Sequence, residues 1–402
     1  NIMLLKNCRL IDSAKRDVRV EESIITEVGE KLRRAPAETV FDATGMILTS
    51  SLAEPHAHLD KAFLAERIEN PSGDLMGAIM AMESNRELIT VDDTIARAER
   101  AIRLMVGNGV TAIRTHADVT EWNNLDSVEA LVEVKRRTSE IVDLQICALL
   151  GWPLSGSNGR HNRELGRRAI KAGADILGGC PHLDEDPSGA NIALLELADE
   201  MNCDLDLHTD EHTDAKRVSL EDLAERVTQT GFKNAVTASH CVSLAMQSHD
   251  TQRRIAEKVA TAGISVIALP HTNLFLQGRE PTTPQPRGLT AIATLRKTGV
   301  RVAIGADNLQ DPFNPIGRGD PLESAALAIL TAHLLPQDAF DAVSSVARQV
   351  MGLDTTTISV GQTANLMLTR AAGLREAIAT TAERPLVMRN GVVVSSRLAA
   401  VN

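Results

Sequence analysis

The chain has 402 residues and a formal net charge of −11 at pH 7. This length suits one large domain of about 250 residues or more together with a smaller appendage. The acidic balance argues against a nucleic-acid-binding surface, because phosphate recognition needs clustered lysines and arginines, but it does not exclude a pocket for one base-like small molecule.

The cysteines are scattered without CxxC spacing, at positions Cys8, Cys147, Cys180, Cys203 and Cys241. An odd and unpatterned set is typical of a reducing compartment rather than of a disulfide framework. No apolar run approaches about 18 residues, and the first residues lack a signal-peptide pattern. We therefore expect a cytoplasmic protein without a membrane partner.

Residues 1 to about 50 predict short alternating strands joined by turns. They are followed by a segment, EPHAHLDK at 54–61, that contains the most informative pair of the chain. Two histidines one residue apart on an extended strand point to the same face, so His56 and His58 can reach one metal ion. This pair alone is a weak signal, and its weight depends on whether histidines or aspartates also end later strands.

From about residue 95 one pattern repeats: an amphipathic helix, a glycine or asparagine stop, and a short apolar strand. The first helix has Ile95, Ala98, Ile102 and Met105 on one face and ends at 107–109. The strands that follow this helix and its successors are predicted at 111–115, 141–149, 174–180, 203–208, 235–240, 264–270 and 300–307. With the strand of the histidine pair, the prediction comprises eight strands separated by helices.

Strands that alternate with helices pair in parallel, and eight such units indicate an α/β fold with a closed, TIM-like (β/α)8 barrel. An open doubly wound sheet is the alternative, but no GxGxxG turn follows the first strand. In barrels, active sites lie at the C-terminal ends of the strands. Those ends carry, in order, His56 with His58, His116, the Gly151-Trp152 loop, His182, His208, His240, His271 and Asp307. Since the chain has only 11 histidines, this clustering predicts a metal site.

Residues from about 355 return to short strands and turns. Asn390-Gly391 between the apolar runs 386–388 and 392–394 is a strong hairpin signal. We expect the β segments from the two chain ends to pair into one small β-sandwich. The predicted domains are this sandwich, from residues 1–50 and 355–402, and a catalytic barrel over residues 51–354.

Three features of the sequence have alternative interpretations. The segment 208–212, HTDEH, matches the HxxEH motif of zinc proteases, which requires a helix. The preceding residues 204–207 alternate aspartate and leucine, a strand period that favours a histidine ligand in the barrel lumen with Glu211 just beyond it. Asp307 could be a helix cap, but opposite the histidine pair of a closed barrel it becomes a fourth ligand. His240 could be a core histidine or lie next to the metal.

The arrangement resembles the amidohydrolase superfamily, and within it the cytosine deaminase branch, over nearly the whole chain. The motifs that carry the resemblance are Glu54–Asp60, Arg114–Val119, His208–Glu211, Thr237–His240, Leu276–Arg279 and Ala306–Asn308. In that family one divalent metal is held by the residues that match His56, His58, His208 and Asp307. The match to Glu211 shuttles protons, and the match to His240 holds the hydrolytic water. Binuclear members add a bridging lysine or glutamate on strand four, and residues 174–180 contain neither, which implies a mononuclear site.

The resulting ligand set suits zinc or ferrous iron. Such an ion lowers the pKa of bound water toward about 7, which predicts metal-hydroxide attack on a ring C=N carbon. Asp307 can accept the proton of the water, and His240 orients the nucleophile. Glu211 would protonate a ring nitrogen, and collapse of the tetrahedral intermediate would release ammonia or an amine.

The sequence predicts the identity of the substrate less closely than it predicts the reaction. Cytosine deaminases carry a glutamine after strand three, where this chain has LLGW at 149–152, and a second aspartate where it has Asn308. Asn308 together with Asp60-Lys61 is more similar to the N-isopropylammelide aminohydrolases. The candidate substrate-binding residues are Trp152 for stacking, Gln277 for reading a carbonyl, and Asn308, His116 and His182. We expect a deaminase of a planar N-heterocycle, either a cytosine-like pyrimidine or an aminotriazine.

Two alternatives stay open. The same mononuclear site could open a cyclic amide or lactone, which would release no ammonia. The chain could also be a catalytically silent ligand-binding barrel, although metal storage does not require a carboxylate placed like Glu211. The expected partner is a small heterocyclic substrate, and the expected assembly is a homo-oligomer.

Overall fold

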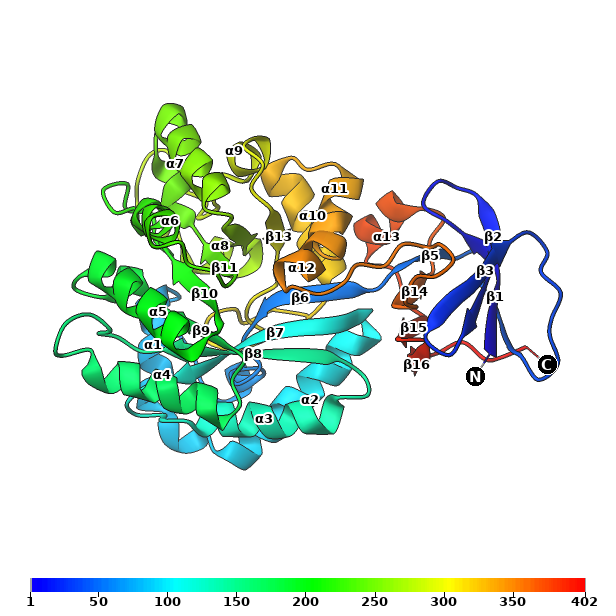
Figure 1. Cartoon of the computed structure of the whole chain (residues 1–402), viewed down its shortest axis with the longest axis horizontal. Helices are drawn as coiled ribbons and strands as arrows, with labels where there is room; N and C mark the ends of the chain where they lie inside the picture. Colours follow the sequence, from blue (N-terminus) through cyan, green and yellow to red (C-terminus); the bar gives the residue numbers. More distant parts are fainter. Residues whose placement is uncertain (1, 402) are drawn as a thin grey trace.

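The computed structural model describes residues 2–401. In Figure 1 a barrel surrounded by helices lies beside a smaller sheet that contains both chain ends. The barrel strands are all parallel and follow the order β13-β12-β11-β10-β9-β8-β7-β6. Their bounds are β6 (Leu52–Ala57), β7 (Val110–Val119), β8 (Asp143–Leu150), β9 (Ile176–Gly179), β10 (Asp204–Thr209), β11 (Val236–His240), β12 (Ser265–Ala268) and β13 (Val302–Ile304). The predicted (β/α)8 barrel is confirmed.

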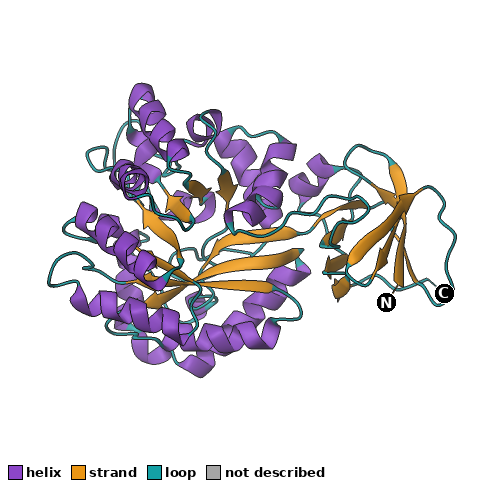
Figure 2. Ribbon diagram, in the orientation of Figure 1, coloured by secondary structure: helices purple, strands orange, loops and turns teal. Residues whose placement is uncertain are grey.

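Helices connect the successive strands and form the outer layer in Figure 2. Those of the barrel are α1 (Leu75–Ser84), α2 (Val91–Gly107), α3 (Asp126–Thr138), α4 (Arg160–Ala172), α5 (Pro187–Met201), α6 (Ser219–Thr230), α7 (His249–Thr261), α8 (Pro270–Leu276), α9 (Ile292–Lys297), α10 (Pro321–Ala332), α11 (Pro336–Ala342) and α12 (Ser345–Val350). Four short 3-10 helices lie in the connections, at Leu64–Glu66, Arg86–Leu88, Pro181–Leu183 and Val242–Met246.

Helix α2 shows how local sequence builds this layer. The Thr90 side chain accepts a hydrogen bond from the Asp93 N–H and caps the helix, and the acidic first turn complements the helix dipole. The predicted apolar face, with Ile95 and Ile102, is buried against the barrel. Gly109 follows the helix with a φ of 98°, a conformation that favours glycine, and returns the chain into β7.

The barrel closes at its C-terminal rim, between β6 and the segment after β13. The Asp307 N–H donates to the His56 carbonyl at 3.0 Å, and Ala57 and Asp307 form a parallel bridge. The buried Glu54 carboxylate accepts the N–H groups of His56 and Ala306, each at 3.1 Å. One side chain therefore holds both edges of the closure, and two predicted metal ligands lie next to one another.

The strands from the two chain ends form one mixed sheet of order β16-β15-β14-β5-β1-β2-β3, with β4 also paired to β1. Their bounds are β1 (Ile2–Arg9), β2 (Lys15–Glu21), β3 (Ile24–Gly29), β4 (Thr39–Asp42), β5 (Ile47–Ser50), β14 (Leu366–Thr369), β15 (Leu386–Arg389) and β16 (Val392–Ser396). Helix α13 (Leu374–Thr380) lies between β14 and β15. A core of its own, with Leu5, Val18, Leu48, Leu366 and Met388, joins strands from both ends of the chain.

The predicted hairpin is also present, because β15 and β16 pair on either side of Asn390-Gly391. Both turn residues have positive φ, and a side chain at Gly391 would collide with the Glu22 carbonyl. The exact domain boundaries near residues 50 and 355 stay a prediction.

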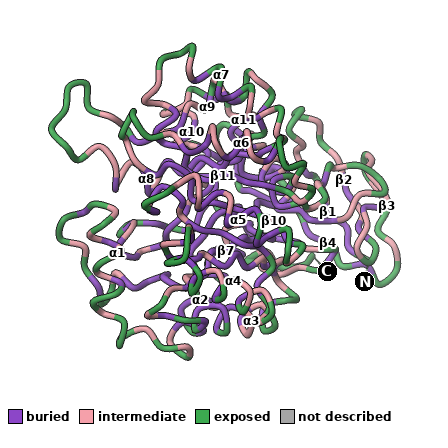
Figure 3. The backbone as a smooth tube through the Cα atoms, turned by 60° about the vertical axis from the view of Figure 1, so that its left-hand side comes forward, coloured by how far each residue is buried: buried purple, intermediate pink, exposed green. Residues whose placement is uncertain are grey.

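Burial follows these layers. In Figure 3 the barrel strands are buried and the exposed segments lie in the outer helices and loops. All five cysteines are free thiols. Among residues 2–401, no helix is long and apolar enough to cross a membrane.

Candidate active site

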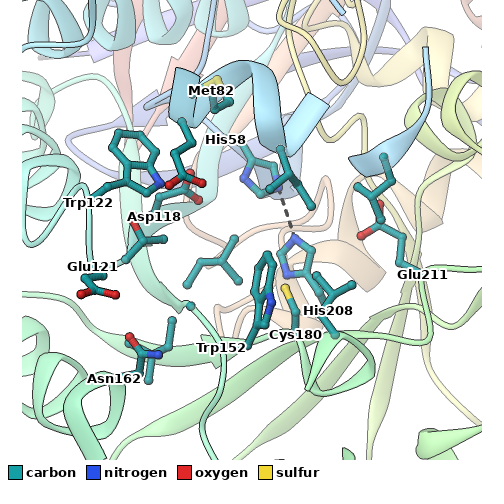
Figure 4. A pocket seen from close by; sticks show the side chains of 18 of the residues that line it. His58, Met82, Asp118, Glu121, Trp122, Trp152, Asn162, Cys180, His208 and Glu211 are labelled. Carbon is teal, nitrogen blue, oxygen red and sulfur yellow. Dashed lines mark hydrogen bonds between the residues drawn. The ribbon is translucent and has the colours of Figure 1, made fainter. Parts of the chain in front are cut away.

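A cavity of about 570 Å³ opens at the C-terminal mouth of the barrel. Figure 4 shows His58 and His208 in the middle of this cavity, with Glu211 on one side and Asp118 and Trp122 on the other. His240 and Asp307 also line it. The cavity thus lies at the end of the barrel where the sequence predicts an active site.

The four predicted metal ligands converge at the floor of this cavity. Asp307 Oδ1 lies 3.4 Å from His56 Nε2 and 3.1 Å from His58 Nε2, and His58 Nε2 lies 3.4 Å from His208 Nε2. Donor atoms held at about 2.0–2.1 Å by a tetrahedral zinc ion lie about 3.4 Å from one another. These spacings suit a divalent metal that His56, His58 and Asp307 could hold. His208 approaches this group through His58, and together with His56 and His116 it also forms a second group of possible metal ligands.

These donor atoms lack other partners. His56 Nε2 and both carboxylate oxygens of Asp307 are buried without a hydrogen bond to any of residues 2–401. Burial alone would raise the pKa of Asp307, but His56 and His58 hold it well below its usual value, so the group is a carboxylate. Burial lowers the pKa of His208 well below its usual value, so its ring is neutral. Neutral imidazoles and a carboxylate are the forms that bind metals.

A chain of hydrogen-bonded side chains below the cavity floor orients His56. Asp206 Oδ2 accepts a hydrogen bond from Arg114 at 3.0 Å, and its Oδ1 accepts one from the Ser239 hydroxyl at 2.8 Å. Since the Ser239 hydrogen points to Asp206, its oxygen accepts from His56 Nδ1, 3.0 Å away. This fixes the tautomer in which the lone pair of His56 Nε2 faces the common centre.

Glu211 and His240 lie beside this centre. His240 Nε2 is 3.6 Å from Glu211 Oε2 and 3.9 Å from Asp307 Oδ2. His240 Nδ1 donates to Asn273 Oδ1 at 3.0 Å, which leaves Nε2 as the acceptor. Burial is the main cause that lowers the pKa of His240 to about 3. Burial, followed by the charge of Asp307, raises the pKa of Glu211 well above its usual value.

Two of these residues have strained backbone conformations. His240 has a φ of 74° and Asp307 a φ of 66°, in the left-handed region that residues other than glycine rarely adopt. Each such residue costs on the order of 1–3 kcal/mol and persists only when its surroundings fix it. Glu54 and the His56 carbonyl supply that fixation for the segment of Asp307.

The proposed substrate-binding residues divide into two sets. Trp152 and Asn308 line the cavity. His116, His182 and Gln277 are not among its lining residues. Gln277 donates its amide N–H to the Glu211 carbonyl at 3.1 Å and supports the loop that follows β10. His182 Nδ1 lies 3.1 Å from the His208 carbonyl and contacts the end of β10 itself. Their contact with substrate stays a prediction.

Two predicted strand ends are placed differently in the structure. Strand β7 continues to Val119, so His116 lies inside the strand, fully buried beneath His56 with a ring-centroid separation of 4.1 Å. Strand β12 ends at Ala268, and His271 lies in helix α8 with its Nε2 3.0 Å from the Ser324 hydroxyl. The runs of apolar residues from which the strands were predicted did not show where these two strands end.

Sequence reasoning missed two features of the site. Asn273, which sets the His240 tautomer, follows β12 in a short helix without a recognisable motif. Lys61 and Asp118 lie at the cavity wall and form an ion pair of 2.7 Å. The signal for the pair was present, because Lys61 follows the histidine pair at the end of β6 and Asp118 follows His116 on the neighbouring strand β7.

Three known proteins are similar to this chain over nearly its whole length. A pterin deaminase of Rhizobium rhizogenes is 34% identical over 391 residues, which cover 96% of this chain and 89% of the relative. The crystal structure of 5-methylcytosine deaminase from Klebsiella pneumoniae, liganded with phosphonocytosine, is 30% identical with a TM-score of 0.90 and full coverage of both chains. That of N-isopropylammelide isopropylaminohydrolase from Burkholderia multivorans is 26% identical with a TM-score of 0.84, also over both full chains.

The family model described as amidohydrolase family matches residues 64–395, which include most of the barrel and the last strands of the flanking sheet. The chain therefore belongs to the amidohydrolase family and is an enzyme that hydrolyses C–N bonds other than peptide bonds.

Proposed function

We propose that this enzyme is a metal-dependent hydrolytic deaminase that replaces an exocyclic amino group of a planar N-heterocycle by oxygen. The observation that carries the proposal is the convergence of three histidines, two carboxylates and an acceptor imidazole at the floor of one cavity. Such a set can activate water, transfer protons and stabilise charge at a single point.

In this proposal one zinc or ferrous ion is held by His56, His58, His208 and Asp307, a donor set that both metals accept. Strand β9 contributes no carboxylate or amine to the lumen, which supports a single ion. When bound, the ion acts as a Lewis acid that makes water a nucleophile at neutral pH.

His240 is proposed to orient the attacking water. Its Nε2 is an acceptor, it has no hydrogen-bond partner among residues 2–401, and it faces both Glu211 and Asp307. A neutral imidazole in that position accepts a hydrogen bond from water and directs the oxygen lone pair toward the substrate carbon. Asp307 can accept a proton through its Oδ2, which also has no partner among the described residues.

Glu211 is proposed to be the proton donor. Its raised pKa favours the protonated carboxyl group, which can protonate the ring nitrogen next to the reacting carbon. The ionised form, once made, lies 3.6 Å from His240 Nε2 and can receive a proton from the water side. The same carboxyl can then deliver a proton to the departing amino group.

The cavity favours a fused bicyclic substrate of the pterin type. Its volume of about 570 Å³ lies within the range of about 300–1,000 Å³ that suits drug-sized ligands and exceeds the need of a single pyrimidine ring. Trp122 and Trp152 line it and can contact a flat ring face. The 34% identical relative is a pterin deaminase, which supports the same class, while cytosine-like pyrimidines and aminotriazines are the single-ring candidates.

The test is an ammonia-release assay with protein of measured metal content, over pterin, cytosine, 5-methylcytosine, isoguanine, and an aminotriazine that can release ammonia or an alkylamine. We expect release from at least one of them, with the oxo compound as product, and release at least about 10²-fold slower by Glu211→Gln at the same metal content. Absence of release from every compound, or a ring-opened product, would overturn the proposal. Cytoplasmic location and homo-oligomeric assembly stay predictions.

A further inference from the structure

A buried ion pair lies in the cavity wall on the side opposite the proton donor. Lys61 is only 3% exposed, and its ammonium group lies 2.7 Å from Asp118 Oδ1 and 3.6 Å from Asp60 Oδ1. It also lies 3.4 Å from Nδ1 of His58, a proposed metal ligand. Figure 4 shows Asp118 and Glu211 on opposite sides of the pocket, with His58 and His208 between them. A ring whose reacting carbon lies at the histidines therefore presents another edge to this pair.

Asp118 has hydrogen-bonding capacity that residues 2–401 do not use. Asp118 is the more accessible partner, with 15% of its side chain exposed against 4% for Lys61, and its second oxygen accepts no hydrogen bond from residues 2–401. The Asp60 carboxylate is directed to the Asp118 N–H at 2.9 Å and thereby fixes the backbone of its neighbour. Burying charged groups this deeply costs free energy unless their remaining donors and acceptors form hydrogen bonds.

Two carboxylates flank Lys61. Its ammonium group lies 2.7 Å from Asp118 Oδ1 and 3.6 Å from Asp60 Oδ1. The wall thus presents a fixed cationic donor next to a fixed anionic acceptor. The neighbouring strand β8 ends in Leu149 and Leu150, so no amide side chain there offers the same two functions.

We propose that Lys61 and Asp118 are the specificity residues that read a lactam edge of the substrate ring. Lys61 donates to the ring carbonyl, and the free oxygen of Asp118 accepts from the adjacent ring N–H. This inference rests on the proposed deaminase function and adds a substrate class to it: oxo-substituted aminoheterocycles, to the exclusion of analogues without the carbonyl.

The selectivity has a simple physical origin. An analogue with hydrogen in place of the carbonyl leaves the Lys61 donor unpaired, and an analogue with an amino group opposes one donor to another. Sites built around buried polar groups reject substrates that lack the matching group by up to about 10⁴–10⁵-fold in kcat/KM. Lys61 and Asp118 already satisfy part of each other's hydrogen-bonding capacity. We therefore expect a smaller preference in kcat/KM for the substrate with the carbonyl, of at least about 10²-fold.

The experiment compares matched substrates: pterin with 2,4-diaminopteridine, and cytosine with 4-aminopyrimidine. Wild type should prefer the lactam member of the pair that it deaminates by at least about 10²-fold in kcat/KM. The double variant Lys61→Met/Asp118→Asn removes both charges together and should bring this ratio close to one, mainly by raising KM for the lactam. Lys135→Met/Asp175→Asn, which alters an exposed lysine–aspartate pair of 2.9 Å on the outer surface, should keep the wild-type ratio.

The outcomes separate the two proposals. If the double variant loses activity equally on both members of a pair at unchanged metal content, the ion pair is structural and the inference is wrong. Should the double variant fail to fold, Asp118→Asn alone decides, because it keeps the volume and an acceptor for Lys61; an unchanged KM for the lactam then refutes the inference. No deamination of any compound by wild type refutes the proposed function instead.

Discussion

Two buried carboxylates, one beside the flanking sheet and one at the barrel floor, differ in whether they have hydrogen-bond partners within the protein. Beside the sheet, Glu38 is buried and accepts hydrogen bonds from Arg19 Nε at 2.7 Å and from the Ala35 N–H at 2.8 Å. At the barrel floor, Asp307 is equally buried, yet neither of its oxygens has a hydrogen-bond partner among residues 2–401. Its nearest polar neighbours are histidine ring nitrogens, with His58 Nε2 at 3.1 Å.

This contrast distinguishes a structural from a functional carboxylate. A buried polar group that lacks partners costs about 1–3 kcal/mol, and more when charged, so proteins satisfy such groups unless a ligand does so. Glu38 needs nothing from outside the chain. Asp307 and the histidines around it share unsatisfied atoms that face one point, and their stability and chemistry should both depend on what binds there.

The largest effect is expected for Asp307→Asn, because it removes the only carboxylate of the four proposed ligands. Activity should fall by more than the about 100-fold that loss of an outer hydrogen-bond partner of a metal ligand costs. Zinc at 100 times its Kd should stabilise wild type by about 2.7 kcal/mol and leave the variant unchanged. The measurements are turnover and thermal unfolding with and without zinc.

Asp311→Asn is the matched control for this variant. Asp311 is also fully buried, but it accepts hydrogen bonds from Asn308, Phe313 and Asn314 and so belongs to the satisfied class. It should lose stability and keep the response to zinc. Equal loss of the zinc response in both variants would show that unsatisfied atoms do not mark the metal ligands.

The next effect in size is that of Glu211→Gln, which separates metal binding from proton transfer. Glutamine keeps the shape of the side chain but cannot give up a proton, so activity should fall by about 10²–10⁴-fold. Zinc content and melting temperature should match wild type. Glu121→Gln, at an exposed carboxylate of the same cavity, should cost little. A comparable loss in both variants would contradict the assignment of Glu211 as proton donor.

Ser239→Ala should have a moderate effect, because Ser239 supports the metal site without facing the centre. The variant removes the acceptor for His56 Nδ1, so zinc affinity should fall about 10–100-fold, while activity at saturating zinc changes less. Competition with a chelator measures the affinity. Ser243→Ala, at a fully buried serine whose hydroxyl has no partner among the described residues, should leave zinc affinity unchanged. A smaller effect at Ser239 than at Ser243 would exclude the proposed orienting chain.

The barrel and its C-terminal rim could be predicted from sequence because both depend on local patterns. Helix periodicity and glycine stops set the strands, and parallel strands bring their C-terminal ends to one rim. This rule places His56, His58 and His208 near the rim, but it selects His182, His240 and His271 equally, and the choice of the proposed ligands came from the resemblance to the amidohydrolase superfamily. Asp307 also lies at the rim, although β13 is only three residues long and the aspartate lies beyond it.

The features that sequence could not predict depend on partners far apart in the chain. Asn273 contacts His240 across 33 residues, and Lys61 contacts Asp118 across 57. Gln277 illustrates the converse, since its loop position favoured substrate contact but its amide is bonded to the Glu211 backbone. Side-chain direction in loops is set by such long-range contacts, for which a single sequence carries no periodic signal.

The smallest effect on activity is expected for Glu38→Gln, which tests the other half of the comparison. Glutamine keeps an acceptor but loses the charge that pairs with Arg19, so the free energy of unfolding should fall by about 1–3 kcal/mol. Zinc affinity and turnover should stay at wild-type values, because Glu38 directly precedes β4 of the sheet built from the chain ends and lies outside the barrel. Urea unfolding together with a zinc titration measures both quantities. A change in zinc affinity would mean that the sheet and the barrel floor are energetically coupled, and a satisfied carboxylate could then no longer be assigned to structure alone.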